Sequence, residues 1–176
     1  HSIFRGREQG RYIITAVTVR LRTVLPQPPF YKAIEAYLHE HSIANPSVRQ
    51  LRDAVVAIRA DKLPDPRAIP NTGSFFKNAI IPHETYEHIA ADYPNMPHYD
   101  LPDGNVKIPT GWLIEQSELK GMLYRGMRVY DKNALVLVNE SARSYDDLAA
   151  ARQHIIDTVQ AKFDIIIQQE PLEISY

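Results

Sequence analysis

Proline constrains this chain more than any other residue type, because it lacks the backbone N–H that helices and sheets use and fixes its own φ. One cluster of prolines lies within residues 26–29. A second group, Pro64, Pro66 and Pro70, lies in a stretch without apolar periodicity at residues 61–74. That composition indicates a stiff, ordered connection rather than a flexible linker, and it predicts a junction between domains.

On either side of these breaks, apolar spacing indicates both strands and helices. Residues 11–22 are rich in β-branched and aromatic types and alternate from Ala16 on, with Val17, Val19 and Leu21 on one face, which predicts a half-buried strand. Residues 30–41 have helical spacing, and a second helix is expected to open at Asn45-Pro46. This second helix is expected to end at Arg59.

The clearest helical pattern comes near the end of the chain. Ser144 is an expected N-cap with Asp147 three residues on, and a stripe of apolar residues follows at helical spacing. The stripe consists of Leu148, Ala151, Ile155, Val159 and Phe163. Strands and helices therefore occur in mixed order with short loops, which predicts an α+β fold rather than a regular βαβ alternation.

Composition excludes several classes of partner. The 176 residues carry a net charge of −1 with scattered cations, so we expect no nucleic-acid binding. No apolar run approaches the roughly 20 residues that cross a bilayer, so we expect no membrane contact. The absence of cysteine is typical of a reducing compartment, and we expect a cytoplasmic protein.

Metal and dinucleotide sites are also not indicated. His83 and His88 are five residues apart on an expected helix and do not share a face, so we expect no metal. The seven glycines are dispersed, and none forms the glycine-rich strand-to-helix loop that holds a dinucleotide phosphate.

Three places could carry chemistry. Ser74 follows Gly73 and precedes two aromatic residues expected to be core anchors, so its hydroxyl could face a pocket, although most such serines only cap turns. Arg59 and Lys62 could hold a diphosphate or carboxylate, or could be solvated charges at a helix end. Glu170 could be an acid or electrostatic partner, or a turn former before proline.

Several segments together resemble a known family. They are SIFR (residues 2–5), RYIITAVTVRL (11–21), RADKLPDP (59–66), GSFFKN (73–78), GWLIEQSELKG (111–121) and ALVLVN (134–139), in this order. The combination is similar to the UDP-N-acetylenolpyruvoylglucosamine reductases, the MurB family.

The resemblance implies a two-step flavin reaction in peptidoglycan precursor synthesis. NADPH reduces FAD, and the reduced flavin passes hydride to the enolpyruvyl double bond of UDP-N-acetylglucosamine enolpyruvate, which gives UDP-N-acetylmuramate. By the same resemblance Ser74 is the proton donor to the enol-like intermediate, and Glu170 stabilises that intermediate. The sequence QQEP around Glu170 departs from the Glu-Pro-Glu run typical of the family.

The resemblance also implies a set of substrate-binding residues. It places Arg59, Lys62 and Asn78 on the substrate, together with Asn133, which stands where the family more usually has glutamine. A tyrosine on a mobile loop completes the set and maps to Tyr31, with Tyr37 as the alternative.

Finally, the resemblance implies how the chain is divided. Residues 1–62 are expected to be the C-terminal part of an incomplete FAD-binding domain, 63–165 the substrate-binding domain, and 166–176 a strand returning to the FAD side. The family's glycine-rich FAD segments lie upstream of SIF, so the chain is expected to be a monomeric fragment, inactive alone and without tightly bound FAD. The alternative is a non-catalytic module that binds a UDP-sugar without flavin.

Overall fold

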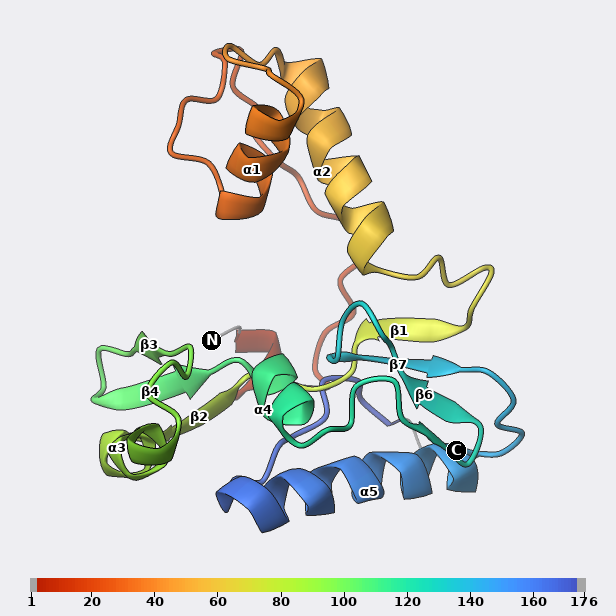
Figure 1. Ribbon diagram of the computed structural model, residues 1–176. Coiled ribbons are helices and arrows are strands. Elements are labelled where there is room, and N and C mark those ends of the chain that lie inside the picture. Colours follow the sequence, from red (N-terminus) through yellow and green to blue (C-terminus); the bar gives the residue numbers. More distant parts are fainter. Residues whose placement is uncertain (1–2, 174–176) are drawn as a thin grey trace. The chain divides into compact units, whose positions relative to one another are not determined.

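A computed structural model describes residues 3–173, and the chain divides into two compact units between Arg52 and Asp53 (Figure 1). The division lies inside helix α2 (Val48–Lys62). Each unit is described by itself. The domain boundaries expected from the sequence stay a prediction. Among residues 3–173, no helix has the length and apolar content needed to cross a membrane.

The first unit contains a short 3-10 helix (Ile3–Arg5), α1 (Lys32–Glu40) and the start of α2. The cap of α2 is Ser47, whereas the sequence placed the opening at Asn45-Pro46. Gln50 N donates to Ser47 Oγ at 3.3 Å, and Ser47 N donates to Gln50 Oε1 at 2.9 Å. This is a reciprocal capping box, which satisfies two N–H groups at the start of the helix.

The predicted strand at residues 11–22 is wrong. Residues 12–22 have no regular secondary structure, and Ile13, Val17 and Leu21 are 91%, 78% and 83% exposed. Alternation identifies which face of a strand would be apolar, but a strand forms only when a neighbour supplies its hydrogen bonds. No strand among the described residues pairs with this segment.

The second unit contains two antiparallel sheets. Four strands have the order β1-β7-β6-β5: β1 (Asn71–Ser74), β5 (Leu123–Tyr124), β6 (Met127–Val129) and β7 (Val136–Asn139). Three strands have the order β2-β4-β3: β2 (Ala79–Pro82), β3 (Tyr99–Asp100) and β4 (Asn105–Ile108). With the helices, this confirms the α+β prediction.

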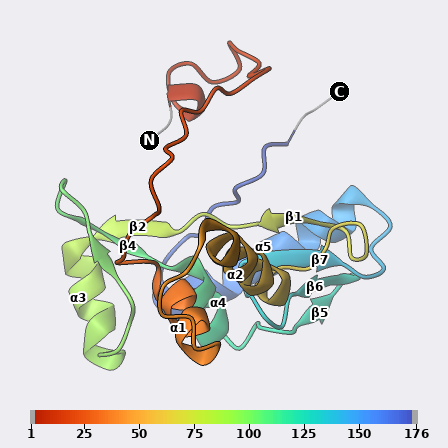
Figure 2. The same cartoon turned by 90° about the horizontal axis from the view of Figure 1, so that it is seen from above.

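Three helices complete the second unit: α3 (His83–Asp92), α4 (Thr110–Gln116) and α5 (Tyr145–Phe163). The cap predicted for α5 is confirmed, because Asp147 N donates to Ser144 Oγ at 3.2 Å. Of the predicted apolar stripe, Leu148 is partly buried and the other four residues are buried. Helix α5 lies along one face of the four-stranded sheet, and α3 packs against β2 and β4 (Figures 1 and 2).

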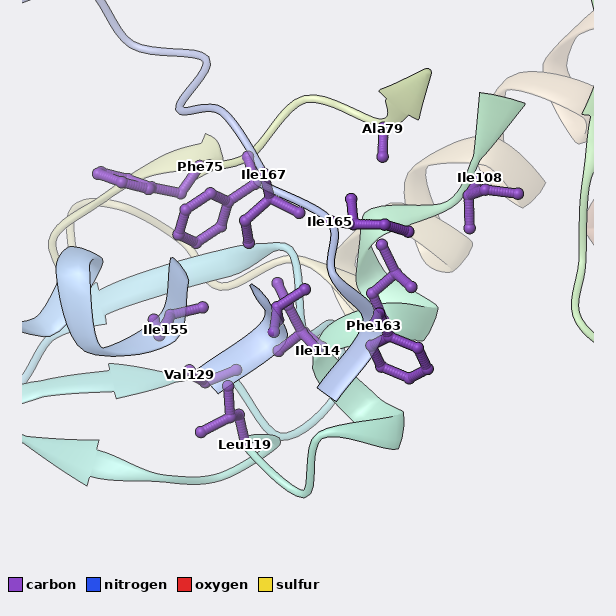
Figure 3. Packing of buried hydrophobic residues seen from close by; sticks show 14 of the residues in the cluster. Phe75, Ala79, Ile108, Ile114, Leu119, Val129, Ile155, Phe163, Ile165 and Ile167 are labelled. Atoms are coloured by element: carbon purple, nitrogen blue, oxygen red, sulfur yellow. The ribbon is translucent and has the colours of Figure 1, made fainter. Parts of the chain in front are cut away.

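The chain after α5 closes the core. Ile165 and Ile167 point inward and are 4% and 2% exposed, whereas Ile166 is 65% exposed (Figure 3). The next residue pairs through its backbone: Lys77 N donates to Gln168 O at 2.8 Å. The closing segment therefore lies directly beside the GSFFKN segment.

Candidate functional site

Ser74 ends β1 immediately after a backbone turn. Gly73 has φ +75°, and its N–H donates to Asn71 Oδ1 at 2.9 Å. A positive φ is readily adopted by glycine and strained for other residues. Ser74 pairs with Val136 of β7, with a register irregularity between residues 71 and 74, and it is exposed. The turn thus presents the Ser74 hydroxyl to solvent from a strand that is fixed in the sheet.

The two phenylalanines after Ser74 are core anchors, as predicted. Phe75 and Phe76 are 5% and 3% exposed and pack edge to face at 5.2 Å between ring centroids. Phe75 N also donates to Leu135 O at 2.6 Å. Burial and this hydrogen bond together fix the backbone that follows Ser74.

Glu170 lies beside the same stretch of backbone. Its N–H donates to Phe75 O at 2.8 Å, and Gln169 forms a bridge with Phe76. Glu170 is partly buried. The fold therefore brings the backbone of Glu170 next to the residue after Ser74, although the two are almost a hundred positions apart in the sequence.

Gln169, the residue before Glu170 in the QQEP sequence, is held in place by hydrogen bonds of its side-chain amide. Arg152 of α5 donates from Nη1 to Gln169 Oε1 at 2.7 Å and also pairs with Glu173. Gln169 Nε2 donates to Pro171 O at 3.1 Å. Hydrogen bonds from Tyr145 and Gln169, with Arg152 nearby, lower the pKa of Glu173. Neither Arg152 nor Gln169 was predicted from the sequence. The two residues are 17 positions apart, and this spacing does not indicate a contact between α5 and the segment that follows it.

Asn78 lies two residues after Phe76 and is exposed, and its side-chain oxygen accepts a hydrogen bond from α4. Thr110 N donates to Asn78 Oδ1 at 3.2 Å. The remaining polar group of the Asn78 amide is Nδ2, which can only donate. Thr110 was missed by the sequence analysis.

Asn133 lies in the turn before β7 and is tied to the same region. Leu135 N donates to Asn133 Oδ1 at 3.1 Å, and it is the carbonyl of Leu135 that accepts from Phe75 N. The neighbouring Lys132 Nζ lies 2.6 Å from Asp61 Oδ1. The pKa of Asp61 is lowered by this hydrogen bond from Lys132, and the pKa of Lys132 is raised by the same bond.

The Asp61–Lys132 pair connects the end of α2 to the turn that carries Asn133. Helix α2 continues to Lys62, beyond the end predicted at Arg59. Arg59 and Lys62 are therefore three residues apart in its last turn, where side chains share a face and cations are favoured by the helix dipole. Both are exposed.

The two tyrosines considered for the substrate loop belong to the first unit. Tyr31 is the N-cap residue of α1 and is 86% exposed. Tyr37 lies inside α1 and stacks on His41 at 3.9 Å between ring centroids. Tyr31 is thus the more accessible of the two.

Among the described residues, the glycines do not form the strand-to-helix turn that holds a dinucleotide phosphate. Of the glycines with open space around them, Gly10, Gly73 and Gly104, none lies in a turn from a strand into a helix. Gly111 is the second residue of α4, but a Cβ there would meet the Leu135 side chain at 3.3 Å, so this glycine serves packing. Within residues 3–173, no three or more His, Cys, Asp or Glu side chains gather as metal ligands would.

The second unit is an α+β domain in which backbone hydrogen bonds of Phe75 join the segments that carry Ser74, Glu170 and Asn133. Residues 65–174 match the family model for the C-terminal domain of UDP-N-acetylenolpyruvoylglucosamine reductase. The chain belongs to the UDP-N-acetylenolpyruvoylglucosamine reductase family, MurB.

Curated relatives agree with this assignment. The chain is 41% identical over 171 residues to the UDP-N-acetylenolpyruvoylglucosamine reductase of Neisseria gonorrhoeae, which covers 97% of this chain and 49% of that protein. It is 40% identical over 173 residues to the enzymes of the same name from Porphyromonas gingivalis and Ralstonia nicotianae, covering 50% and 51% of them. The chain thus spans about half the length of the curated relatives it matches.

Proposed function

We propose that this chain supplies the substrate-binding half of an enzyme that reduces UDP-N-acetylglucosamine enolpyruvate to UDP-N-acetylmuramate in peptidoglycan precursor synthesis. One observation carries the proposal. The backbone of Phe75 accepts a hydrogen bond from Glu170 N and donates one to Leu135 O. The segments that carry Ser74, Glu170 and Asn133 are therefore held together through a single buried residue.

Ser74 is the proton donor in this proposal. Hydride addition to one carbon of the enolpyruvyl double bond leaves an enol-like intermediate, and a proton on the other carbon completes the lactyl ether. A serine hydroxyl is weakly acidic, so the proton transfer depends on a basic intermediate held close to Ser74. Glu170 would stabilise that intermediate through electrostatics and hydrogen bonding.

The remaining residues would bind the UDP-sugar. Arg59 and Lys62 lie on one turn of α2 and offer two positive charges to a diphosphate. Asn78 and Asn133 would add amide groups from the GSFFKN segment and from the turn before β7. We propose that Tyr31 is the loop tyrosine, because it is far more exposed than Tyr37.

FAD, reduced by NADPH, would supply the hydride. The described residues contain no phosphate-binding glycine turn, so we propose that FAD is held by the part of the relatives that this chain does not span, and that the chain alone is inactive. The domain boundaries 1–62, 63–165 and 166–176 belong to the same proposal, as do a cytoplasmic location and a monomeric state.

The test is a Ser74→Ala substitution in the full-length reductase, with Ser141→Ala as the matched control. Ser141 is also an exposed serine after a β-strand, but it belongs to none of the segments above. Ser74→Ala should leave reduction of FAD by NADPH nearly intact and slow reduction of the enolpyruvyl substrate by about 10²- to 10⁴-fold, the usual contribution of general acid catalysis.

Two results would count against the proposal. Equal losses in both half-reactions would point to a folding defect rather than a lost proton donor. If the unsubstituted full-length protein binds the UDP-sugar but neither binds FAD nor oxidises NADPH, the alternative of a non-catalytic UDP-sugar-binding module replaces the reductase.

A further inference from the structure

Thr110 is a polar residue that is completely buried at the start of α4. Its hydroxyl donates to Lys77 O at 2.6 Å and accepts from Ala79 N at 3.0 Å. Burying a hydroxyl is costly unless it is hydrogen-bonded, and here it serves as both donor and acceptor. These two bonds connect α4 to the residues immediately before and after Asn78.

The backbone of Thr110 makes a third bond to the same place. The first N–H groups of a helix have no partner within the helix. In α4, the N–H of Thr110 donates to Asn78 Oδ1 at 3.2 Å. One residue therefore holds the backbone on both sides of Asn78 and the Asn78 side chain itself.

This arrangement determines which group Asn78 presents outward. A backbone N–H can bond only to an acceptor, so the amide oxygen must face α4 and the amide nitrogen must face away from it. Asn78 is exposed, so its outward group is a fixed N–H donor. A donor held in this way suits a ligand rich in acceptor oxygens, such as a phosphate or diphosphate.

We propose that Thr110 is a positioning residue that orients Asn78 toward an acceptor-rich group of the substrate, the diphosphate of the UDP-sugar. The proposal rests on the function proposed above. Thr110 contacts no substrate in this view and acts only through the GSFFKN segment. Its loss should weaken substrate binding more than it slows the chemical step.

The experiment is Thr110→Val in the full-length reductase, with steady-state kinetics and thermal melting. Valine has nearly the same shape but no hydroxyl, so Lys77 O and Ala79 N lose their partner. Misplacement of a binding group by about 1 Å can cost up to about 10²-fold. We therefore expect KM for the enolpyruvyl UDP-sugar to rise by about 10- to 100-fold, with a smaller change in kcat.

Two comparisons separate positioning from plain stability. Thr110→Ser keeps the hydroxyl and should return KM to within about threefold of the original. Thr158→Val removes a hydroxyl that donates to His154 O within α5, and it should change KM little. In an Asn78→Ala background, Thr110→Val should raise KM little further, because its target is already gone.

Each outcome has a clear meaning. If Thr110→Val lowers the melting temperature but leaves KM unchanged, Thr110 is only structural and the proposal fails while the reductase stands. If the unsubstituted protein does not use or bind the substrate, both proposals fail together. If Thr110→Val does not fold, Thr110→Cys retains a weaker donor and acceptor in the same place and should raise KM in the same direction. An unchanged KM in a folded Thr110→Cys protein would overturn the inference.

Discussion

The glycine before Ser74 offers a test that separates strain from function. Gly73 and Gly104 both have positive φ, +75° and +81°, and a Cβ added to either would meet no atom within 4 Å. Gly104 lies between β3 and β4, in the sheet that does not contain Ser74. Alanine at the two positions should therefore introduce the same strain and no collision, but only one change lies next to the proposed proton donor.

The size of the stability loss follows from two opposing terms. Holding an L-residue at positive φ costs about 1–2 kcal/mol. Alanine also restricts the unfolded chain, which returns about 0.4–1 kcal/mol. Each variant should thus lose about 1 kcal/mol of unfolding free energy, or about 2–4 °C in Tm for a chain of this size. Urea denaturation and thermal melting of the 176-residue chain would measure this loss.

Turnover of the enolpyruvyl substrate should differ between Gly73→Ala and Gly104→Ala. An alanine at residue 73 can relieve its strain by rotating toward negative φ, which would tilt β1 and displace the Ser74 hydroxyl. We expect Gly73→Ala to lower turnover of the enolpyruvyl substrate by about 10- to 100-fold in the full-length reductase, as displacements of about 1 Å do. Gly104→Ala should change turnover little. Equal turnover in the two variants, at equal stability, would refute the claim that this turn positions Ser74.

Two further predictions concern the second unit alone. Gly126→Ala should destabilise the protein far more than Gly104→Ala, because its Cβ would lie 2.4 Å from Ala142 N, and a backbone atom cannot move aside as a side chain can. Similar losses of unfolding free energy for the two variants in urea denaturation would contradict this prediction. The pKa of Asp147 is lowered, chiefly by the hydrogen bond from Arg143 N and then by Ser144. A lowered folded pKa means that the stabilisation is present above the unfolded value of about 3.9 and is lost as pH falls through the folded value. In Asp147→Asn, the free energy of unfolding should therefore fall less between about pH 5 and pH 2 than in the original protein. An equal fall in urea denaturation would show that Asp147 does not contribute to the acid sensitivity of the fold.

Local signals in the sequence were sufficient where the structure is local. The α5 cap depends on Ser144 and Asp147, three residues apart, and the sequence predicted it correctly. The strand predicted at residues 11–22 failed because pairing is not local. The start of α2 differs, because its signal is local but ambiguous: Asn45-Pro46 and the Ser47–Gln50 pair each resemble a helix start, and the structure uses Ser47 as the cap.

The residues of the candidate site also divide into those that a local motif indicates and those that depend on contacts with distant segments. The resemblance proposed Ser74, Asn78 and Glu170 as site residues because Ser74 and Asn78 lie in GSFFKN and Glu170 lies in the closing segment, and these assignments stay predictions. Thr110 and Arg152 could not be found in this way, since each acts on a segment that is distant in sequence. Thr110 looks like an ordinary first residue of a helix, and only its contacts across 31 to 33 positions indicate a role.

The proton-donor role proposed for Ser74 sets opposing demands on its surroundings, and the end of β1 is compatible with both. In the proposed role, the Ser74 hydroxyl has to reach the substrate, so the residue must be exposed, and it must also be held in place, because proton transfer depends on distance. Side-chain contacts around Ser74 would restrict access. Here the restraint comes instead from the neighbouring backbone, through Gly73 on one side and the two hydrogen bonds of Phe75 on the other. Substitutions that keep these backbone bonds should therefore be tolerated better than substitutions that break them, even when the latter lie farther from the hydroxyl.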